Sequence, residues 1–254
     1  METPFVPDAP MHHLGQTRSS IQKDHALLTP DTFVRTPLPG MKNAMAIVHT
    51  APAFGAAFTQ YTAELEKNGA LGTTAAQRFV YVIDGEVSLE IYAKKRRLAR
   101  ASFAFIPPRT KCRISATATT RLAVIEKIYE PLAGVAVPKL LIGEEASIAS
   151  ESLLDAAGLQ VRHLLPDEPA FDFAVNVMTY EPGAALPMVE SHVMEHGLLM
   201  LDGAGIYRLG DRWYPVAAGD FIWMAPYCLQ WFGALGKVPA KYLVYKPWNR
   251  HPLG

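Results

Sequence analysis

Short apolar runs, separated by turn residues, recur along the whole chain. In 171–183, "FDFAVNVMTYEPG", apolar residues alternate from Phe171 to Val177 before a Pro-Gly pair, which is typical of a β-strand followed by a turn. The segments 79–86, 219–226 and 241–246 are rich in β-branched and aromatic residues and are also bounded by turn residues. Many short strands separated by turns predict an all-β fold of the sandwich or barrel type.

A helix is expected in only one place. The segment 143–159, "GEEASIASESLLDAAGL", is rich in glutamate, alanine and leucine, which favour helices, and it lies between two strand-rich halves. We therefore expect a short helical connector there.

The two halves share an internal repeat. Shifted by 118 residues, 79–112 aligns without a gap on 197–230, which places Asp84-Gly85 on Asp202-Gly203 and "SFAFIPP" on "DFIWMAP". The chain is thus expected to contain two tandem copies of one β-domain. The expected divisions are an N-terminal extension over 1–40, an N-terminal domain over 41–135, a connector over 136–160 and a C-terminal domain over 161–254.

Composition and charge narrow the possible partners. The 24 Lys and Arg equal the 24 Asp and Glu, so no net field attracts nucleic acid or an anionic membrane. Two cysteines cannot form a disulfide framework and favour a reducing compartment. The first twenty residues lack the apolar run of a signal peptide, and "EPLAGVAVPKLLIG" is too short and interrupted to span a bilayer. These features predict a soluble, cytoplasmic protein without nucleic-acid or membrane partners.

The segment 188–197, "MVESHVMEHG", carries the main candidate chemistry. At strand spacing Glu190, His192 and His196 point to one face, and Gln230 lies on the expected partner strand. In a barrel interior these side chains would offer two oxygen and two imidazole donors to a divalent metal. The donor set alone permits Mn, Fe, Ni or Zn. Glu195 would then face away from the metal.

The same segment permits a second interpretation. A helix after Pro187 would bring His192, Glu195 and His196 together as in a zinc peptidase. Such a site needs a third protein ligand, usually a glutamate, and no glutamate follows Glu195. His251 keeps this interpretation open, but the strand spacing is favoured.

The first copy has a different set of residues at the aligned positions. Gly72, Thr74, Arg78 and Cys112 stand where the second copy has Glu190, His192, His196 and Gln230. The first three cannot ligate a divalent metal. The N-terminal domain is therefore expected to be a degenerate, metal-free copy.

Three further residues of the second copy are candidates for substrate chemistry. Tyr242 and Lys246 are four residues apart on an expected strand and so share a face, and Tyr207 follows the Asp-Gly turn. A lysine beside metal ligands could pair with a substrate carboxylate or act as an acid or base. The residues equally allow Lys246 as a solvated charge and the tyrosines as packing groups.

The motifs around these residues resemble the cupin superfamily and, along nearly the whole chain, the (S)-ureidoglycine aminohydrolase family. The resemblance rests on "HLGQTRSSIQKDHALLTPDTFV", "PLPGMKNA", "ESHVMEHG", "GDFIWMAPYCLQWFGALG" and "KYLVYKPWNR". Ala225 and Tyr227 depart from the general cupin pattern, which has proline and glycine there. The Glu-x-His-x-x-x-His set with a later Gln is the most specific element, because general cupins carry three histidines and one glutamate.

The resemblance implies a bicupin of two tandem jelly-roll barrels. It implies one Mn²⁺ held by Glu190, His192, His196 and Gln230, substrate binding by Glu190, Tyr207, Tyr242 and Lys246, and catalytic roles for Lys246 and Tyr242. The implied reaction is hydrolytic loss of ammonia from (S)-ureidoglycine, giving (S)-ureidoglycolate in purine and allantoin degradation. The implied partners are a small anionic ureide and further copies of the chain in a homo-oligomer.

Two alternatives accompany this interpretation. One is another metal-dependent cupin enzyme, an isomerase or dioxygenase acting on a small carboxylic acid. The other is a non-enzymatic, ligand-binding bicupin. Ammonia release without oxygen uptake separates the first interpretation from both.

Overall fold

The computed structural model describes residues 16–153 and 155–250, and nearly all of its regular structure is β-strand. The strands of the first half are β1 (Ser20–Ile21), β2 (His25–Leu28), β3 (Arg35–Thr36), β4 (Lys42–Thr50), β5 (Thr59–Leu71), β6 (Gln77–Asp84), β7 (Glu86–Ile91), β8 (Lys94–Ala99), β9 (Ser102–Ile106), β10 (Cys112–Ala116) and β11 (Thr120–Lys127). Those of the second half are β12 (Leu141–Glu144), β13 (Glu151–Ser152), β14 (Leu159–His163), β15 (Phe173–Tyr180), β16 (His196–Asp202), β17 (Ala204–Leu209), β18 (Arg212–Ala217), β19 (Phe221–Met224), β20 (Gln230–Leu235) and β21 (Ala240–Pro247).

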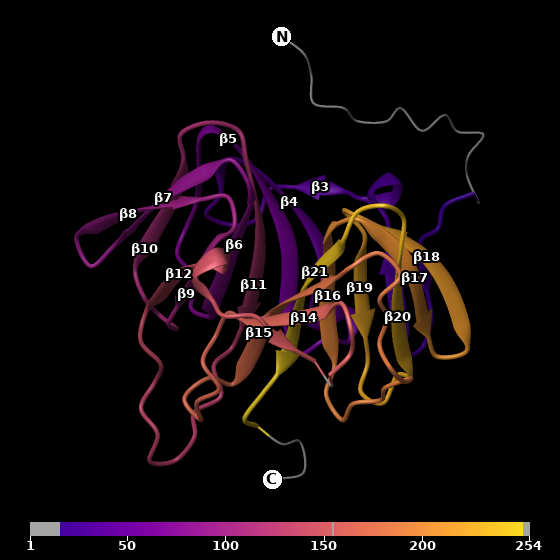
Figure 1. Cartoon of the computed structure of the whole chain (residues 1–254). Coiled ribbons are helices and arrows are strands. Elements are labelled where there is room, and N and C mark those ends of the chain that lie inside the picture. The colour runs from indigo at the N-terminus through magenta and orange to yellow at the C-terminus, as the bar shows by residue number, and fades with distance from the viewer. Residues whose placement is uncertain (1–15, 154, 251–254) are drawn as a thin grey trace.

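The strands form two barrels that lie side by side (Figure 1). The first is a ten-stranded sheet in the order β12-β9-β6-β11-β5-β10-β7-β8, with β3 and β4 joined to it through β5. The second combines an eight-stranded sheet, β1-β2-β19-β16-β21-β15-β14-β13, with a three-stranded sheet, β18-β17-β20. We call them the first and second barrel. The all-β prediction of two tandem barrels is confirmed.

The internal repeat is visible in the strand positions. β7, β8 and β10 begin 118 residues before β17, β18 and β20, and β11 begins 120 residues before β21. The pairing agrees: Val80 lies opposite Val124 in the first barrel, and Leu198 lies opposite Val244 in the second. Positions in the two barrels can therefore be compared residue by residue.

The helix expected over 143–159 does not form. The segment contains β12, a single turn of 3-10 helix at Glu145–Ser147, and β13; two other such turns occur at Pro30–Thr32 and Pro52–Phe54. Its helix propensity is overridden because β12 pairs with β9 and β13 pairs with β14, so that ladder hydrogen bonds replace those of a helix. Residue 154 lies outside the described part of the segment.

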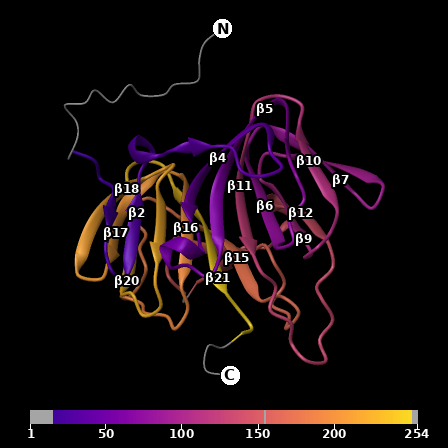
Figure 2. The ribbon, with the colours of Figure 1, turned by 180° about the vertical axis from the view of Figure 1, so that it is seen from behind.

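The first half of the chain contributes β1 and β2 to the second barrel, and the second half contributes β12 to the first. β2, within the expected N-terminal extension, pairs with β19 of the second barrel, and β12, within the expected connector, pairs with β9 of the first. Figure 2 shows β2, in the colour of the chain start, among the orange strands of the second barrel. Residues 1–15 of the expected extension lie outside the described residues. Through these strands, the backbone hydrogen bonds of each barrel include a segment from the other half of the chain.

Three apolar cores organise the molecule. One fills the second barrel around Tyr180, Leu198 and Phe232, and one fills the first around Leu65, Leu89 and Leu122. The third lies between the barrels and is strongly aromatic, with members such as Phe58, Phe79, Phe103, Phe173, Phe221 and Tyr245. β15, β16, β19 and β21 are therefore buried on both faces, which explains continuous apolar runs such as "YLVY".

No helix of the described residues is long and apolar enough to cross a membrane.

Candidate metal and substrate site

A cavity of about 410 Å³ opens into the interior of the second barrel. All seven residues that the sequence marked as candidates line this one cavity: Glu190, His192, His196, Tyr207, Gln230, Tyr242 and Lys246. They come from β16, β17, β20 and β21 and from the loop before β16. The fold therefore brings together residues that are up to 56 positions apart in the sequence.

Glu190 and Gln230 are joined through their backbones. An isolated antiparallel bridge links them, and each backbone N–H donates to the other residue's carbonyl oxygen at 2.8 Å. This bridge holds the Glu190 carboxylate and the Gln230 amide close together, although the two residues belong to different sequence motifs.

The expectation that Glu190, His192 and His196 lie on one continuous strand is wrong. β16 begins only at His196, and 191–195 form a loop. Bonds to other segments hold this loop: Tyr227 N–H donates to the carbonyl oxygen of His192 at 2.6 Å, and the Glu195 carboxylate accepts bonds outside the cavity. The donors still converge, because the bridge at one end and the strand at the other fix both ends of the loop.

The peptidase interpretation is also wrong for the described residues, since no helix forms over 188–196. Glu195 lies outside the cavity as expected for the strand spacing. Its carboxylate accepts hydrogen bonds from Ala57 N–H at 2.8 Å and from Trp223 Nε1–H at 3.0 Å. His251, the remaining possible ligand of that interpretation, lies outside the described residues.

The two imidazoles differ in environment. His196 is buried, and desolvation lowers its pKa to about 3, with the nearby charges of His192 and Lys246 acting in the same direction. It is therefore neutral at physiological pH, the form in which imidazole binds metals. His192 is 37% exposed, its ring centroid lies 5.0 Å from that of His196, and its Nε2 is 3.3 Å from Oε2 of Glu190.

Two tyrosines, Tyr207 and Tyr242, line the cavity, and Tyr180 contacts Tyr242 from outside it. Tyr207 OH donates to Oε1 of Gln230 at 3.2 Å, and the hydroxyls of Tyr242 and Tyr180 lie 2.7 Å apart. Burial raises the pKa of each of these phenols well above its usual value, so all three keep their protons. The hydroxyls can thus orient the amide and donate into the cavity.

Among the described residues, Lys246 is the only lysine that lines this cavity. Burial lowers its pKa, while the charges of Asp167 and Glu190 oppose that shift. Its Nζ lies 4.1 Å from the centroid of the Trp248 ring, which holds the ammonium by a cation–π contact. Lys246 is therefore partly desolvated beside the donors rather than a solvated charge at the strand end.

The sequence missed several residues of the cavity wall. His163 and Asn176 line it and are hydrogen-bonded to each other at 3.1 Å, and Met194 and Trp248 also contribute. Asn176 could have been noticed as a polar residue inside the apolar run of 171–178. Trp248 and Met194 stand in loops, where no periodic pattern indicates direction.

The residues present fit a divalent metal. A carboxylate, an amide oxygen already positioned by Tyr207, and two imidazoles, one of them held neutral, face the same cavity. Oxygen and imidazole donors suit Mn, Fe, Ni and Zn, so the donors themselves do not choose among these ions.

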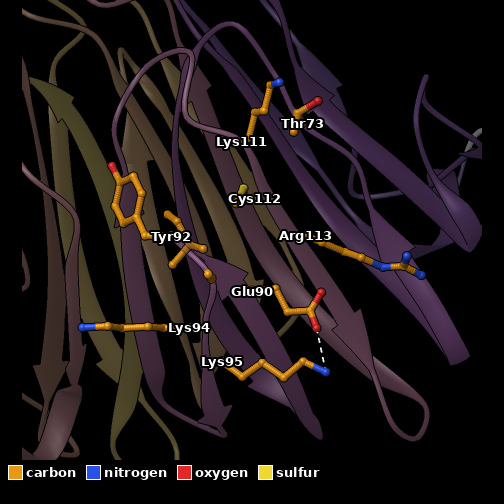
Figure 3. Close-up of a pocket in the computed structure, with 10 residues that line it drawn as sticks. Thr73, Glu90, Tyr92, Lys94, Lys95, Lys111, Cys112 and Arg113 are labelled. Atoms are coloured by element: carbon orange, nitrogen blue, oxygen red, sulfur yellow. Dashed lines mark ion pairs between the residues drawn. The ribbon is translucent and has the colours of Figure 1, made fainter.

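A hollow of about 530 Å³ lies at the β7–β8 hairpin of the first barrel (Figure 3). Its cationic side chains do not converge: Lys94 and Arg113 extend in opposite directions, and Lys95 is paired with Glu90 at 2.7 Å. The hollow therefore does not concentrate positive charge on one point.

Comparisons with known proteins identify the family of the chain. A family model described as the cupin domain matches residues 176–245. The chain is 40% identical over 244 residues to an (S)-ureidoglycine aminohydrolase of Arabidopsis thaliana, covering 94% of this chain and 80% of the relative. The chain belongs to the (S)-ureidoglycine aminohydrolase family. A member from Escherichia coli K12 is 32% identical over 232 residues, covering 89% and 88% of the two chains.

Solved structures show the same bicupin architecture. A putative glyoxylate-induced protein from Pseudomonas aeruginosa has a TM-score of 0.85 at 31% identity, over 92% of each chain. The protein Ylba from E. coli has a TM-score of 0.83 at 28% identity, over 95% of this chain and 98% of the other. Oxalate decarboxylase of Bacillus subtilis, at 10% identity and a TM-score of 0.68, shares the fold. The bicupin prediction is confirmed.

Proposed function

We propose that this protein hydrolyses (S)-ureidoglycine to (S)-ureidoglycolate and ammonia at the cavity of the second barrel, with one Mn²⁺ per chain. In this reaction the bond between the α-carbon and its amino nitrogen breaks, a bond to a water oxygen forms, and the nitrogen leaves as ammonia. The observation that carries the proposal is the convergence of all seven candidate residues on one cavity, in a chain of this family.

Glu190, His192, His196 and Gln230 would hold the metal, since they supply two oxygen and two imidazole donors. A divalent ion held by these residues would supply Lewis-acid polarisation of a small bidentate ligand and would help to orient it. Tyr207 keeps the Gln230 amide oriented through its 3.2 Å hydrogen bond.

Lys246 and Tyr242 act on the substrate. The Lys246 ammonium, backed by the Trp248 ring, faces the cavity and pairs with the carboxylate of a small ureide. Because burial lowers its pKa, the Nζ ammonium of Lys246 can also donate a proton to the departing substrate nitrogen. Nζ takes up a proton again after the reaction. Tyr242 OH, which is held by Tyr180 at 2.7 Å, donates a hydrogen bond to the substrate beside it.

The test is a His192→Ala variant. His192 is in a loop and 37% exposed, so its removal spares the barrel core, while bound Mn²⁺ and ammonia release from fresh ureidoglycine should be lost together. The matched control is Thr74→Ala, at the aligned position of the first barrel, which should keep both. Metal-free His192→Ala that released ammonia at the wild-type rate would contradict the metal assignment.

The substrate has its own test. Manganese-loaded wild-type protein should release ammonia from ureidoglycine without consuming oxygen. Oxygen uptake would favour a cupin dioxygenase, and failure to release ammonia with metal bound would contradict the proposed substrate.

A further inference from the structure

A second group of metal-binding side chains lies outside the cavity. Asp24, His25 and Cys228 each present a ligand atom, and these three atoms lie within 4.8 Å of one another. Among the described residues, no other group of three or more His, Cys, Asp or Glu side chains has all its ligand atoms this close together. The ligand atoms of Glu190, His192 and His196 in the cavity are therefore further apart as a set. None of the three lines the cavity.

The group joins the donated strand to the second barrel. His25 begins β2 and lies opposite Met224 of β19, and Ala225 N–H donates to the carbonyl oxygen of Asp24 at 2.8 Å. Cys228 follows in the turn between β19 and β20. The backbone therefore fixes the three residues relative to one another, although they are about 200 positions apart in sequence.

The His25 ring is held as metal-bound imidazoles are held. Its Nε2 lies 2.9 Å from Tyr214 OH, which in turn lies 3.3 Å from Oγ of Ser20, while its Nδ1 faces Oδ1 of Asp24 at 2.8 Å. If Nδ1 binds a metal, His25 Nε2–H donates a hydrogen bond to the Tyr214 oxygen, and Tyr214 O–H donates a hydrogen bond to Oγ of Ser20. A ligating histidine commonly donates its other N–H to such a partner, which fixes tautomer and orientation.

Space and access fit an ion. His25 and Cys228 are 2% and 5% exposed, whereas the Asp24 side chain is 48% exposed and leaves an entry path. Gly210, at φ +60°, borders the group: a Cβ there would lie 3.3 Å from Oδ2 of Asp24 and 3.9 Å from Nδ1 of His25. A side chain at this position would crowd the donors, and glycine removes that obstruction.

We propose that Asp24 Oδ, His25 Nδ1 and Cys228 Sγ form a second metal site, selective for a thiophilic divalent cation of the Zn²⁺ type. One sulfur, one imidazole and one carboxylate with a water match the tetrahedral, mixed-donor coordination of zinc. Among the described residues no cysteine lines the cavity, so the two sites differ in preference, and the thiolate selects the softer ion at the second. Binding displaces the thiol proton to solvent.

The site fastens the donated strand to the turn that supports the cavity. The same turn carries Tyr227, whose N–H holds the His192 carbonyl at 2.6 Å, and it leads directly into Gln230. A metal at Asp24, His25 and Cys228 therefore stabilises the position of two residues of the cavity without touching the substrate.

Cobalt is the probe for this site. Full-length apoprotein loaded with Co²⁺ should show a thiolate-to-cobalt charge-transfer band, and Cys228→Ser should lose it. Cys112→Ser, the other cysteine of the chain, should keep it. Since neither cysteine lines the cavity, cobalt bound there does not produce this thiolate band. Absence of the band in wild-type protein, or its persistence in Cys228→Ser, would overturn the proposal.

A second variant guards against misfolding of Cys228→Ser. Asp24→Asn keeps the size of a half-exposed side chain, and it should weaken Zn²⁺ binding at least about tenfold in competition with a chromophoric chelator, because a charged donor is lost. The zinc content of wild-type protein should exceed that of Asp24→Asn by one equivalent, with manganese content unchanged. Equal zinc affinity in the two proteins would also overturn the proposal.

Discussion

The two barrels carry different polar side chains at aligned positions of the barrel interior. Where the second barrel has the neutral donor His196, the first has Arg78, and where the second has Lys246, the first has Glu126. The guanidinium of Arg78 bonds Glu126 at 2.7 Å through Nε and the carbonyl oxygen of Gly72 at 2.7 Å through NH1. The first barrel thus contains a permanent cation of its own.

The tyrosines make the same contrast. Tyr180, Tyr207 and Tyr242 of the second barrel occupy the positions of Leu65, Leu89 and Leu122 in the first, as the strand registers show. All three leucines are fully buried in the core of the first barrel. One repeat is therefore packed as an apolar core closed by an ion pair, and the other keeps hydroxyls and a cavity at the same places.

Restoring donors to the first barrel would need more than exchanged side chains. Gly72 stands at the place of Glu190, and a Cβ there would lie 2.9 Å from the carbonyl oxygen of Gly40. A glutamate cannot enter without moving the backbone. The difference between the barrels is therefore built into the chain path as well as into the side chains.

The largest expected effect comes from breaking the ion pair of the first barrel. Arg78→Met leaves Glu126 partly buried without its cation and should lower the free energy of unfolding by about 4 kcal/mol in urea titrations. Arg78→Met/Glu126→Met should recover most of this loss, because both charges are gone. Manganese content should stay at the wild-type value in both. A single variant as stable as wild type would show that the pair is not essential to this barrel.

The donated strands test the comparison next. Leu27 of β2 faces Ile222, and Ile142 of β12 faces Ala104 at the aligned position of the other barrel. Leu27 is fully buried and Ile142 only partly, so Leu27→Ala should cost about 3 kcal/mol and Ile142→Ala about 1 kcal/mol. Only Leu27→Ala should also weaken metal retention in the cavity. Equal losses would mean that the two strands contribute alike.

The contrast between local and distant pairing explains what the sequence could and could not predict. The grouping of Glu190, His192, His196 and Gln230 at one cavity could be predicted, because the four residues lie within two short motifs whose spacing carries information. The pairing of β2 with β19 was not accessible, since it joins segments almost 200 residues apart and neither has a local signal for its partner. The helix predicted over 143–159 was wrong because β12 pairs with β9, about 40 residues earlier in the chain, while β13 pairs locally with β14.

The loop before β16 shows the same limit on a smaller scale. The strand spacing correctly predicted that Glu195 points away from Glu190, His192 and His196. The segment that carries it is nevertheless a loop and not a strand. The bonds from Glu195 to Ala57 and Trp223 decide the path, and Ala57 belongs to the other half of the chain. A pattern within ten residues cannot contain that contact.

The interface between the barrels should give a pH effect of intermediate size. His49 of β4 is stacked on Phe221 of the second barrel at 4.8 Å, and burial lowers its pKa from 6.5 to about 3. Below pH 6.5 His49 becomes protonated in the unfolded chain, whereas in the folded chain it stays neutral down to about pH 3. Stability is therefore lost as pH falls through this window, by about 2 kcal/mol between pH 6.5 and 5.

His49→Phe removes this titration while keeping an aromatic ring at the interface. In urea titrations, the free energy of unfolding of wild type relative to the variant should fall by about 2 kcal/mol between pH 6.5 and pH 5, whatever the difference is at neutral pH. A difference that stays constant with pH would show that His49 is protonated equally in the folded and unfolded chains.

The smallest effect should come from Tyr180, which distinguishes the barrels without lining the cavity. Tyr180→Phe removes the 2.7 Å hydrogen bond to Tyr242 and should lower the free energy of unfolding by about 1 kcal/mol. If Tyr180 positions the Tyr242 hydroxyl, kcat/KM for ammonia release should fall by about fivefold, since 1.4 kcal/mol is a factor of ten. Tyr242→Phe should lower kcat/KM further, because Tyr242 itself lines the cavity. Tyr92→Phe, at an exposed tyrosine of the first barrel, should change neither quantity. A Tyr180→Phe protein that lost stability but kept full kcat/KM would restrict the residue to packing, and would leave Tyr207 and Gln230 as the polar contact that orients the cavity.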